Sequence, residues 1–287
     1  MQFWGGTTFL KVTEAVALAA MLDDAGYDGI ITSDHLIYPR DLASPYPSPS
    51  GKPMWSPDTA WPDCWVLTGA MAAVTTRLRF SNAIYVAPSR PLLEVAKQVA
   101  TASVLSGGRV TLGAGIGWMR EEYELLGQDF STRGKRLDEM IPALRELWRG
   151  GWVSWSGTYY QVPEMMIEPH PAQRVPIWCG GESDAALRRA ARLCDGWVGY
   201  AYTWDDAVPY VEKLTTLRRE YGRENEHFDV LLALLDKPTV DLYKRAEHIG
   251  ITAVMCAPWF GTPDGPDAER YRAPIERFAD EIISKFR

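Results

Sequence analysis

Strand-like and helix-like segments alternate along the whole chain, and this alternation limits the folds that the sequence can adopt. Each short apolar run of strand length is followed by a stretch with apolar residues at helical spacing. Eight such βα units in 287 residues predict a single α/β domain, a TIM (β/α)8 barrel spanning residues 1–287. A doubly wound parallel sheet is the alternative, although it normally shows a clearer break between domains. The predicted strands are Met1–Trp4, Gly29–Thr32, Leu78–Val86, Arg109–Ala114, Pro176–Cys179, Gly196–Gly199, Phe228–Leu234 and Thr252–Cys256.

Helices are predicted between these strands, and Ser131 or Thr132 is expected to cap the central one. Two segments interrupt the pattern. Trp152–Val162 alternates around a Ser-Gly pair and predicts an inserted hairpin. Pro39–Pro62 is rich in Pro and Ser and follows the second strand, so it predicts a long loop or lid over the C-terminal face of the barrel. The predicted helices are Val12–Ala25, Cys64–Thr75, Leu92–Leu105, Arg133–Trp148, Asp184–Leu193, Asp205–Tyr221, Thr239–His248 and a last one running from Tyr271 to Phe286.

The composition argues against several classes of protein. A net charge of -7 and a pI near 5.2 disfavour a nucleic-acid partner bound through its phosphate backbone. No apolar run reaches the ~18 residues that span a bilayer, and the N-terminus lacks the pattern of a signal peptide. The four cysteines are scattered without a C-x-x-C pair, as expected for reduced thiols of a cytoplasmic protein. No metal site is expected, because the four histidines show no His-x-His or His-Glu-x-x-His spacing.

Three alternating glycines, Gly113, Gly115 and Gly117, lie where the fourth predicted strand passes into the helix-like run Met119–Tyr123. Glycine at such a corner lets the backbone approach a neighbour or a ligand more closely than any Cβ would permit. In parallel α/β proteins this end of a strand is where the chemistry is usually placed. The spacing is only a weak dinucleotide signal, because it is not the full Rossmann pattern.

The second strand ends in Ser33-Asp34-His35, directly before the predicted lid. A histidine there can donate or accept a proton near neutral pH, and the adjacent Asp34 can orient it or bind a ligand. The alternative is a histidine that merely ends the strand. At the third strand, Ser81, Asn82 and Ala83 are small or short residues in an apolar run, and they would admit a flat ring against the backbone.

The fifth strand ends in Gly180-Gly181-Glu182-Ser183, and a helix follows. Two glycines and a Ser cap leave backbone N–H groups free, which is typical of an anion site with phosphate as the expected guest. An ordinary Ser-capped helix after a tight glycine turn is the alternative. Glu182 would repel a phosphate unless its side chain points away.

Taken together, these segments resemble the bacterial luciferase-like superfamily of flavin- and deazaflavin-dependent barrel enzymes. The mixture most resembles the branch of probable coenzyme F420-dependent oxidoreductases. Seven matching elements in the right order, spread over most of the chain, make the resemblance specific. They are Ala25-Gly26-Tyr27-Asp28-Gly29 with Ser33-Asp34-His35, Pro88-Ser89-Arg90-Pro91 with Ala96-Lys97, Leu105–Val110, Gly113–Tyr123, Arg133–Glu139, Pro176–Gly181 and Asp195-Gly196-Trp197.

The resemblance implies that the tricyclic ring of F420, or alternatively FMN, lies against the ends of strands two, three and four. It also implies a non-proline cis peptide near Asn82–Ile84 and proton transfer by His35. The cofactor phosphate would meet the turn after strand five. The cofactor-binding residues implied in this way are Asp34, Asn82, Ala83, Ile84, Trp118, Glu121, Gly180, Gly181 and Ser183.

One departure from the pattern concerns the substrate. F420-dependent sugar-phosphate dehydrogenases of the superfamily carry a proton-donating glutamate where this chain has Trp118. The resemblance therefore favours a bulkier or more apolar substrate than a sugar phosphate. The chain contains 12 tryptophans, which suit an aromatic pocket, a subunit interface or simply the core. The aromatic residues considered as pocket walls are Trp4, Tyr38, Trp55, Trp61, Tyr202, Trp204 and Trp259.

Three functions follow as hypotheses. The first is hydride transfer between F420 and a small organic molecule, with His35 moving a proton on the substrate. The second is an FMN-dependent monooxygenase that uses O2 and receives reduced flavin from a separate reductase. The third is a non-catalytic flavin-binding barrel. A homodimer is expected from the resemblance, and the tryptophan content is compatible with one.

Overall fold

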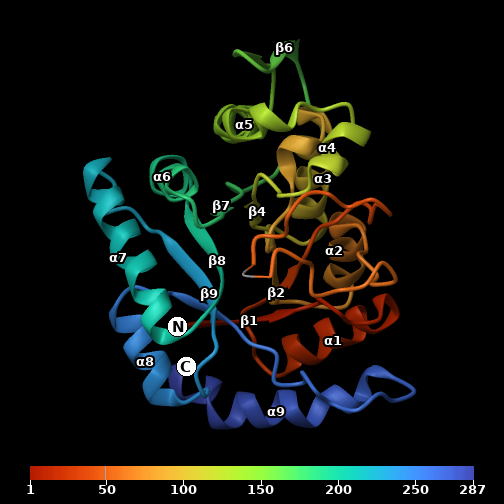
Figure 1. The fold of residues 1–287 in the computed structure, drawn as a ribbon, viewed down its shortest axis with the longest axis vertical. Helices are drawn as coiled ribbons and strands as arrows, with labels where there is room; N and C mark the ends of the chain where they lie inside the picture. The colour runs from red at the N-terminus through yellow and green to blue at the C-terminus, as the bar shows by residue number, and fades with distance from the viewer. Residues whose placement is uncertain (49) are drawn as a thin grey trace.

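The computed structural model describes residues 1–48 and 50–287. Eight parallel strands form one sheet in the order β3-β2-β1-β10-β9-β8-β7-β4, and helices surround the strands (Figure 1). The TIM-like α/β barrel predicted from the alternation is confirmed. Its strands are β1 (Gln2–Gly6), β2 (Gly29–Thr32), β3 (Arg79–Asn82), β4 (Leu112–Ala114), β7 (Ile177–Gly180), β8 (Gly196–Tyr202), β9 (Asp229–Leu234) and β10 (Ala253–Met255).

The sheet closes between its two edge strands, β3 and β4, through isolated bridges. Phe80 pairs with Val110 before the end of β3, and Tyr85 pairs with Ala114 after it. Between these two bridges, residues 81–84 face residues 111–113, so the β3 chain carries one residue more than its partner. An extra residue of this kind bends the strand and interrupts its hydrogen bonding with the neighbouring strand. The closure point of the barrel is therefore a bulge at the C-terminal end of β3.

The helices between the strands cover the outside of the barrel. The inserted hairpin predicted around residue 156 is present as the antiparallel pair β5 (Val153–Ser156) and β6 (Gln161–Met165), which extends beyond α5 at the top of Figure 1. The helices are α1 (Val12–Asp24), α2 (Cys64–Ala72), α3 (Leu92–Leu105), α4 (Arg120–Leu125), α5 (Arg133–Leu147), α6 (Asp184–Leu193), α7 (Trp204–Glu220), α8 (Val240–His248) and α9 (Arg272–Glu281). The short 3-10 turns are η1 (Ala87–Ser89), η2 (Phe130–Thr132), η3 (Ala268–Tyr271) and η4 (Ile283–Phe286).

Two local predictions were correct only in part. Thr132 stands at the N-cap of α5, as predicted, but its side chain makes no cap hydrogen bond; the Asp129 carboxylate accepts the Ser131 N–H and starts the 3-10 turn that leads into the helix. The predicted last helix is interrupted at Ile282, where the backbone departs from helical geometry and a 3-10 turn follows. In both places the apolar periodicity continues through a change in helix type, so the pattern alone does not reveal the change.

The inside of the barrel holds its own apolar cluster, separate from the larger core between strands and helices. Trp4 on β1 and Trp178 on β7 meet edge to face, with ring centroids 5.2 Å apart. Both indoles are buried, so they fill the barrel and do not line an open site. Ala83, Ile84 and Met255 pack against this cluster. The rest of the cluster is Ile31, Val198, Leu231 and Ala253.

Candidate functional site

The end of β3 and the residues after it form the floor of the candidate site. The peptide bond between Ala83 and Ile84 is cis, where the family resemblance predicted one. Asn82 is buried, whereas Ala83 and Ile84 are half-buried and rest on the cluster inside the barrel. These two residues therefore present a partly exposed strip of backbone and small apolar atoms at the C-terminal end of the strands.

The alternating glycines let β4 pack directly against this floor. A Cβ on Gly113 would lie 1.8 Å from the carbonyl oxygen of Asn82, and a Cβ on Gly115 would lie 2.2 Å from Cδ1 of Ile84. No side chain fits either position without displacing its neighbour. The glycine run thus shapes the floor, and its role is close packing against the chain after β3.

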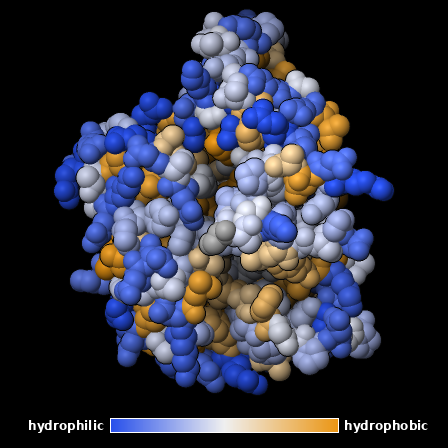
Figure 2. Space-filling view, viewed as in Figure 1, coloured by the Kyte–Doolittle hydropathy of each residue, from blue (hydrophilic) through white to orange (hydrophobic). Residues whose placement is uncertain are grey.

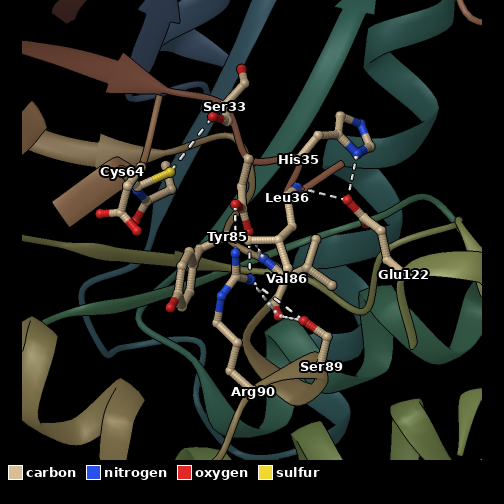
Figure 3. Close-up of polar contacts among 12 residues, drawn as sticks. Ser33, His35, Leu36, Cys64, Tyr85, Val86, Ser89, Arg90 and Glu122 are labelled. Atoms are coloured by element: carbon tan, nitrogen blue, oxygen red, sulfur yellow. Dashed lines mark hydrogen bonds and ion pairs between the residues drawn. The ribbon is translucent and has the colours of Figure 1, made fainter. Parts of the chain in front are cut away.

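His35 follows β2, and a buried carboxylate holds its imidazole. Nδ1 of His35 lies 3.4 Å from Oε1 of Glu122. The same oxygen accepts the backbone N–H of Leu36 at 2.7 Å (Figure 3). Glu122 is only 4% exposed and comes from α4, directly after the glycine run. Among the described residues, the hydrogen bonds of His35 involve Nδ1, which leaves Nε2 to meet a ligand.

Three tryptophans surround this imidazole and Tyr46 packs against two of them; we call these four residues the aromatic cage. The ring centroids of Trp55, Trp61 and Trp118 lie 5.1, 5.2 and 5.7 Å from that of His35. Tyr46 completes the cage, with its ring 5.2 Å from Trp118. Three of the four residues come from the loop between β2 and α2, so this loop covers His35 and leaves its side chain 10% exposed. The long loop predicted after the second strand therefore lies over the site.

The start of α4 also fixes this loop. Oε1 of Glu121 accepts the backbone N–H groups of Ala43 at 2.8 Å and Ser44 at 3.0 Å. In return, the backbone N–H of Arg120 donates to the hydroxyl of Ser44. Burial raises the pKa of the Glu121 carboxyl, but the hydrogen bonds from Ser44 and Ala43 outweigh it and hold the pKa below its usual value. Glu121 thus anchors the loop while its neighbour Glu122 anchors His35.

Asp34 is held by residues of the segment that follows the floor. Its two carboxylate oxygens accept the two terminal nitrogens of Arg90 at 2.8 Å each, and Oδ2 also accepts the backbone N–H of Val86 at 2.8 Å. The guanidinium of Arg90 stacks over the ring of Tyr85, 4.3 Å from its centroid. A fork of this kind is among the stronger ion pairs because it is bidentate and largely buried. In this structure Asp34 therefore braces the segment that continues from Ile84.

The turn after β7 has features of an ordinary Ser-capped helix and also of an anion site. Ser183 caps α6, since its hydroxyl accepts a backbone N–H of the first turn at 3.2 Å. Gly181 and Ser183 are nevertheless exposed, and Gly181 has a positive φ of 113°. The carboxylate of Glu182 accepts the hydroxyl of Tyr202 at 2.6 Å. Phosphate binding at this turn, which Gly180 begins, stays a prediction.

A space-filling view of the molecule shows a central hollow with apolar residues at its margins (Figure 2). Of the aromatic residues considered as pocket walls, Trp55 and Trp61 lie beside His35. Trp4 fills the barrel interior, Trp259 is buried at 4% exposure, and Trp204 packs under the guanidinium of Arg245. The tryptophan excess is therefore divided between the core and the site.

Sequence reasoning missed three residues of the site: Glu122, Arg90 and Tyr46. A signal existed for Glu122, because it lies between Met119 and Tyr123 on the apolar side of a short helix, and a lone acid there calls for a partner. The matching element Pro88-Ser89-Arg90-Pro91 includes Arg90 without giving it a role, and no local pattern marks Tyr46. Arg90 pairs with Asp34, which is distant in sequence and follows another strand. Tyr46 contacts Trp118 only because of the course of an irregular loop.

Neither a metal centre nor a membrane span is found in the described part of the chain. Among residues 1–48 and 50–287, no three His, Cys, Asp or Glu side chains gather as metal ligands would. Within the same residues, no helix has both the length and the apolar character needed to cross a membrane.

Comparison with known proteins supports the resemblance. Residues 4–235 match the sequence model of the luciferase-like monooxygenase family. The chain belongs to this family. An uncharacterised protein of Mycobacterium tuberculosis is 37% identical over 289 residues, which cover 99% of this chain and 100% of that protein. An F420-dependent glucose-6-phosphate dehydrogenase of Microbacterium testaceum is 32% identical over 227 residues, 76% of this chain and 62% of that enzyme.

Among solved structures, the monooxygenase RslO1 of Streptomyces bottropensis superposes with a TM-score of 0.77 at 16% identity, over 100% of both chains. At that identity the likeness shows the fold alone. The family is described as one of monooxygenases, and an F420-dependent enzyme is among the relatives that resemble this chain in sequence.

Proposed function

We propose that this luciferase-like protein transfers a hydride between coenzyme F420 and an uncharged, apolar organic molecule. The observation that carries the proposal is the placement of His35. Its imidazole is fixed through Nδ1 by buried Glu122, and it follows the strand that neighbours the half-buried floor of Ala83 and Ile84. A proton-transferring group beside a flat surface is the arrangement that hydride transfer to a carbonyl or from an alcohol requires.

The floor suits a planar tricyclic ring. Ile84 lies so close to Gly115 and Gly180 that a Cβ on either glycine would approach its side chain to 2.2 or 2.3 Å. The two glycines leave room for the Ile84 side chain, so the strip presents backbone and apolar atoms to a bound ring. The buried side-chain oxygen of Asn82 has no hydrogen-bond partner among the described residues, so it is available to a donor on a bound ring. We expect the phosphate to meet Gly181 and the N–H groups near Ser183.

Bound F420 supplies the site that gives or accepts the hydride. The residues of the chain then have three tasks. Nε2 of His35 accepts the proton that the substrate hydroxyl releases as an alcohol becomes a carbonyl, and it returns that proton to the oxygen in the reverse reaction. Trp55 and Trp61 of the aromatic cage exclude water from the imidazole. Asp34 and Arg90 keep the segment after the floor in place.

The nature of the cage favours an apolar substrate. By the family resemblance, Trp118 stands where sugar-phosphate dehydrogenases carry their proton-donating glutamate, and here the indole packs against His35. Arg90, which follows the floor in sequence, is already paired with Asp34 and is not free to bind a substrate phosphate. Aromatic rings bind apolar or aromatic molecules through area and ring geometry. We therefore expect a secondary alcohol or ketone with a hydrophobic body.

Titration of the purified protein with F420 and with FMN tests the proposal. We expect micromolar binding of F420, a loss of the fluorescence of oxidised F420 when an apolar alcohol is added, and its recovery when a ketone is added to the reduced cofactor. Micromolar binding of FMN without binding of F420 would refute the proposal and favour a flavin monooxygenase. Binding of either cofactor without turnover across a broad substrate panel would favour a non-catalytic barrel.

Two further expectations belong to this proposal. We propose a homodimer formed by the outer faces of α2 and α3, where Val66, Val104 and Leu105 are exposed at 75, 46 and 66%. Light scattering tests the stoichiometry. We also propose a reducing, cytoplasmic setting, because the four cysteines are free.

A further inference from the structure

We infer that Glu122 is a positioning residue that fixes the tautomer of His35, so that Nδ1 carries a proton and Nε2 is presented to the substrate. No part of the family resemblance assigns a role to this carboxylate. The inference uses the proposed function only for the chemical role of His35. The tautomer itself is a property of the protein without cofactor.

The hydrogen bonds around Glu122 determine the direction of its contact with the imidazole. Oε1 accepts the backbone N–H of Leu36 at 2.7 Å and lies 3.5 Å from that of Ile37. An ionised carboxylate is only an acceptor, and two backbone N–H groups already point at this oxygen. The contact between this oxygen and Nδ1 of His35 at 3.4 Å therefore needs the proton on Nδ1.

Burial makes this contact selective. The side chains of His35 and Glu122 are 10 and 5% exposed, so little water competes for Nδ1. The rings of Trp55, Trp61 and Trp118 cover the imidazole on other sides and offer no acceptor comparable with a carboxylate. In a carboxylate–imidazole pair of this kind, the carboxylate sets which nitrogen is protonated and how the ring is oriented. In the neutral ring, Nε2 then holds the lone pair.

The neighbouring residue provides a matched control. Glu121 lies on the same turn of α4 and carries the same charge, but its carboxylate binds the N–H groups of Ala43 and Ser44 and not the imidazole. Replacing Glu121 changes the contacts of the loop and removes one negative charge. Replacing Glu122 does the same and also removes the acceptor that faces Nδ1 of His35. A difference between the two variants isolates the contact with His35.

The test is nitrogen NMR of the histidine side chains in the cofactor-free protein, at a pH where the ring is neutral. His35→Ala assigns the signals. In the wild type we expect the proton on Nδ1. In Glu122→Ala we expect Nδ1 to shift toward the resonance of an unprotonated nitrogen, since an isolated imidazole prefers the proton on Nε2. Glu122→Gln keeps an acceptor oxygen and should retain the wild-type tautomer, as should Glu121→Ala.

Three results would overturn the inference. They are a wild-type proton on Nε2, an unchanged tautomer in Glu122→Ala, and a shift in Glu121→Ala as large as that in Glu122→Ala. If Glu122→Ala does not fold, the wild type and Glu122→Gln still decide, because a Gln variant with the proton on Nε2 also contradicts the inference. Failure of F420 binding would refute the proposed function and leave these spectra unaffected, so the two failures are distinguishable.

Discussion

The glycines of β4 permit a quantitative test of how the floor is built. In Gly113→Ala the new Cβ would lie 1.8 Å from the backbone carbonyl oxygen of Asn82, so one strand must move by roughly 1 Å or more to reach even a 3.0 Å contact. The hydrogen bond from the N–H of Tyr85 to the carbonyl of Gly113, 2.7 Å long, resists that movement. Overpacking typically destabilises by about 1–3 kcal/mol. We expect a loss of about 3 kcal/mol, because the obstacle is backbone.

Gly115→Ala provides the contrast, because its Cβ meets a side chain. The nearest atom is Cδ1 of Ile84 at 2.2 Å, which can rotate away, so we expect a loss of about 1–2 kcal/mol. Truncation by Ile84→Ala removes the clashing atoms, and its coupling energy with Gly115→Ala should be about 1 kcal/mol or more. The same truncation should combine additively with Gly113→Ala, within about 0.5 kcal/mol.

Urea unfolding followed by circular dichroism and tryptophan fluorescence measures these free energies. Gly69→Ala in α2 is the control, because a Cβ there meets no atom within 4 Å and should be neutral or slightly stabilising. The reasoning would be refuted if Gly113→Ala stayed within about 0.5 kcal/mol of the wild type. It would equally fail if Ile84→Ala rescued Gly113→Ala as fully as it rescues Gly115→Ala.

Three further predictions concern the site. His35→Ala should lower kcat by about 10²–10⁴-fold while F420 still binds, as measured by steady-state kinetics and cofactor titration; unchanged turnover would remove the proposed role of the imidazole. Glu121→Gln should be less stable than the wild type at neutral pH. Because the folded-state pKa of Glu121 lies below its ordinary value of 4.5, this stabilisation is present above that value and is lost as the pH falls through the folded-state pKa. A stability gap that persists or widens in acid, measured by urea unfolding at several pH values, would contradict the mechanism. Trp55→Ala should increase the rate at which diethyl pyrocarbonate modifies His35, read by peptide mass spectrometry, whereas Trp204→Ala, on α7, should not; equal rates in all three proteins would mean that Trp55 does not shield the imidazole.

Much of the fold is encoded in local periodicity, which is why it was predictable. Parallel strands buried on both sides appear as short apolar runs, and amphipathic helices between them as spaced apolar residues. Gly29–Thr32 and Leu92–Leu105 match their predicted bounds. Element ends were less accurate. The third predicted strand continued to Val86, whereas β3 ends at Asn82, because the apolar run persists through the bulge that closes the barrel.

The site was predictable only in part. Local sequence placed His35 at a strand end, and the family resemblance placed the cis peptide after β3. The contact between His35 and Glu122 joins residues 87 positions apart, and a single sequence gives no measure of such pairings. The aromatic cage depends on the path of a loop without regular secondary structure, where no periodicity constrains which side chain points inward.

A crystal structure of the protein with F420 tests the central claim most directly. The account predicts that the ring contacts Ala83 and Ile84, that the imidazole of His35 lies on the open side of the ring, and that Glu122 still holds Nδ1. A ring bound elsewhere on the barrel, or a His35 side chain turned away from it, would contradict the account.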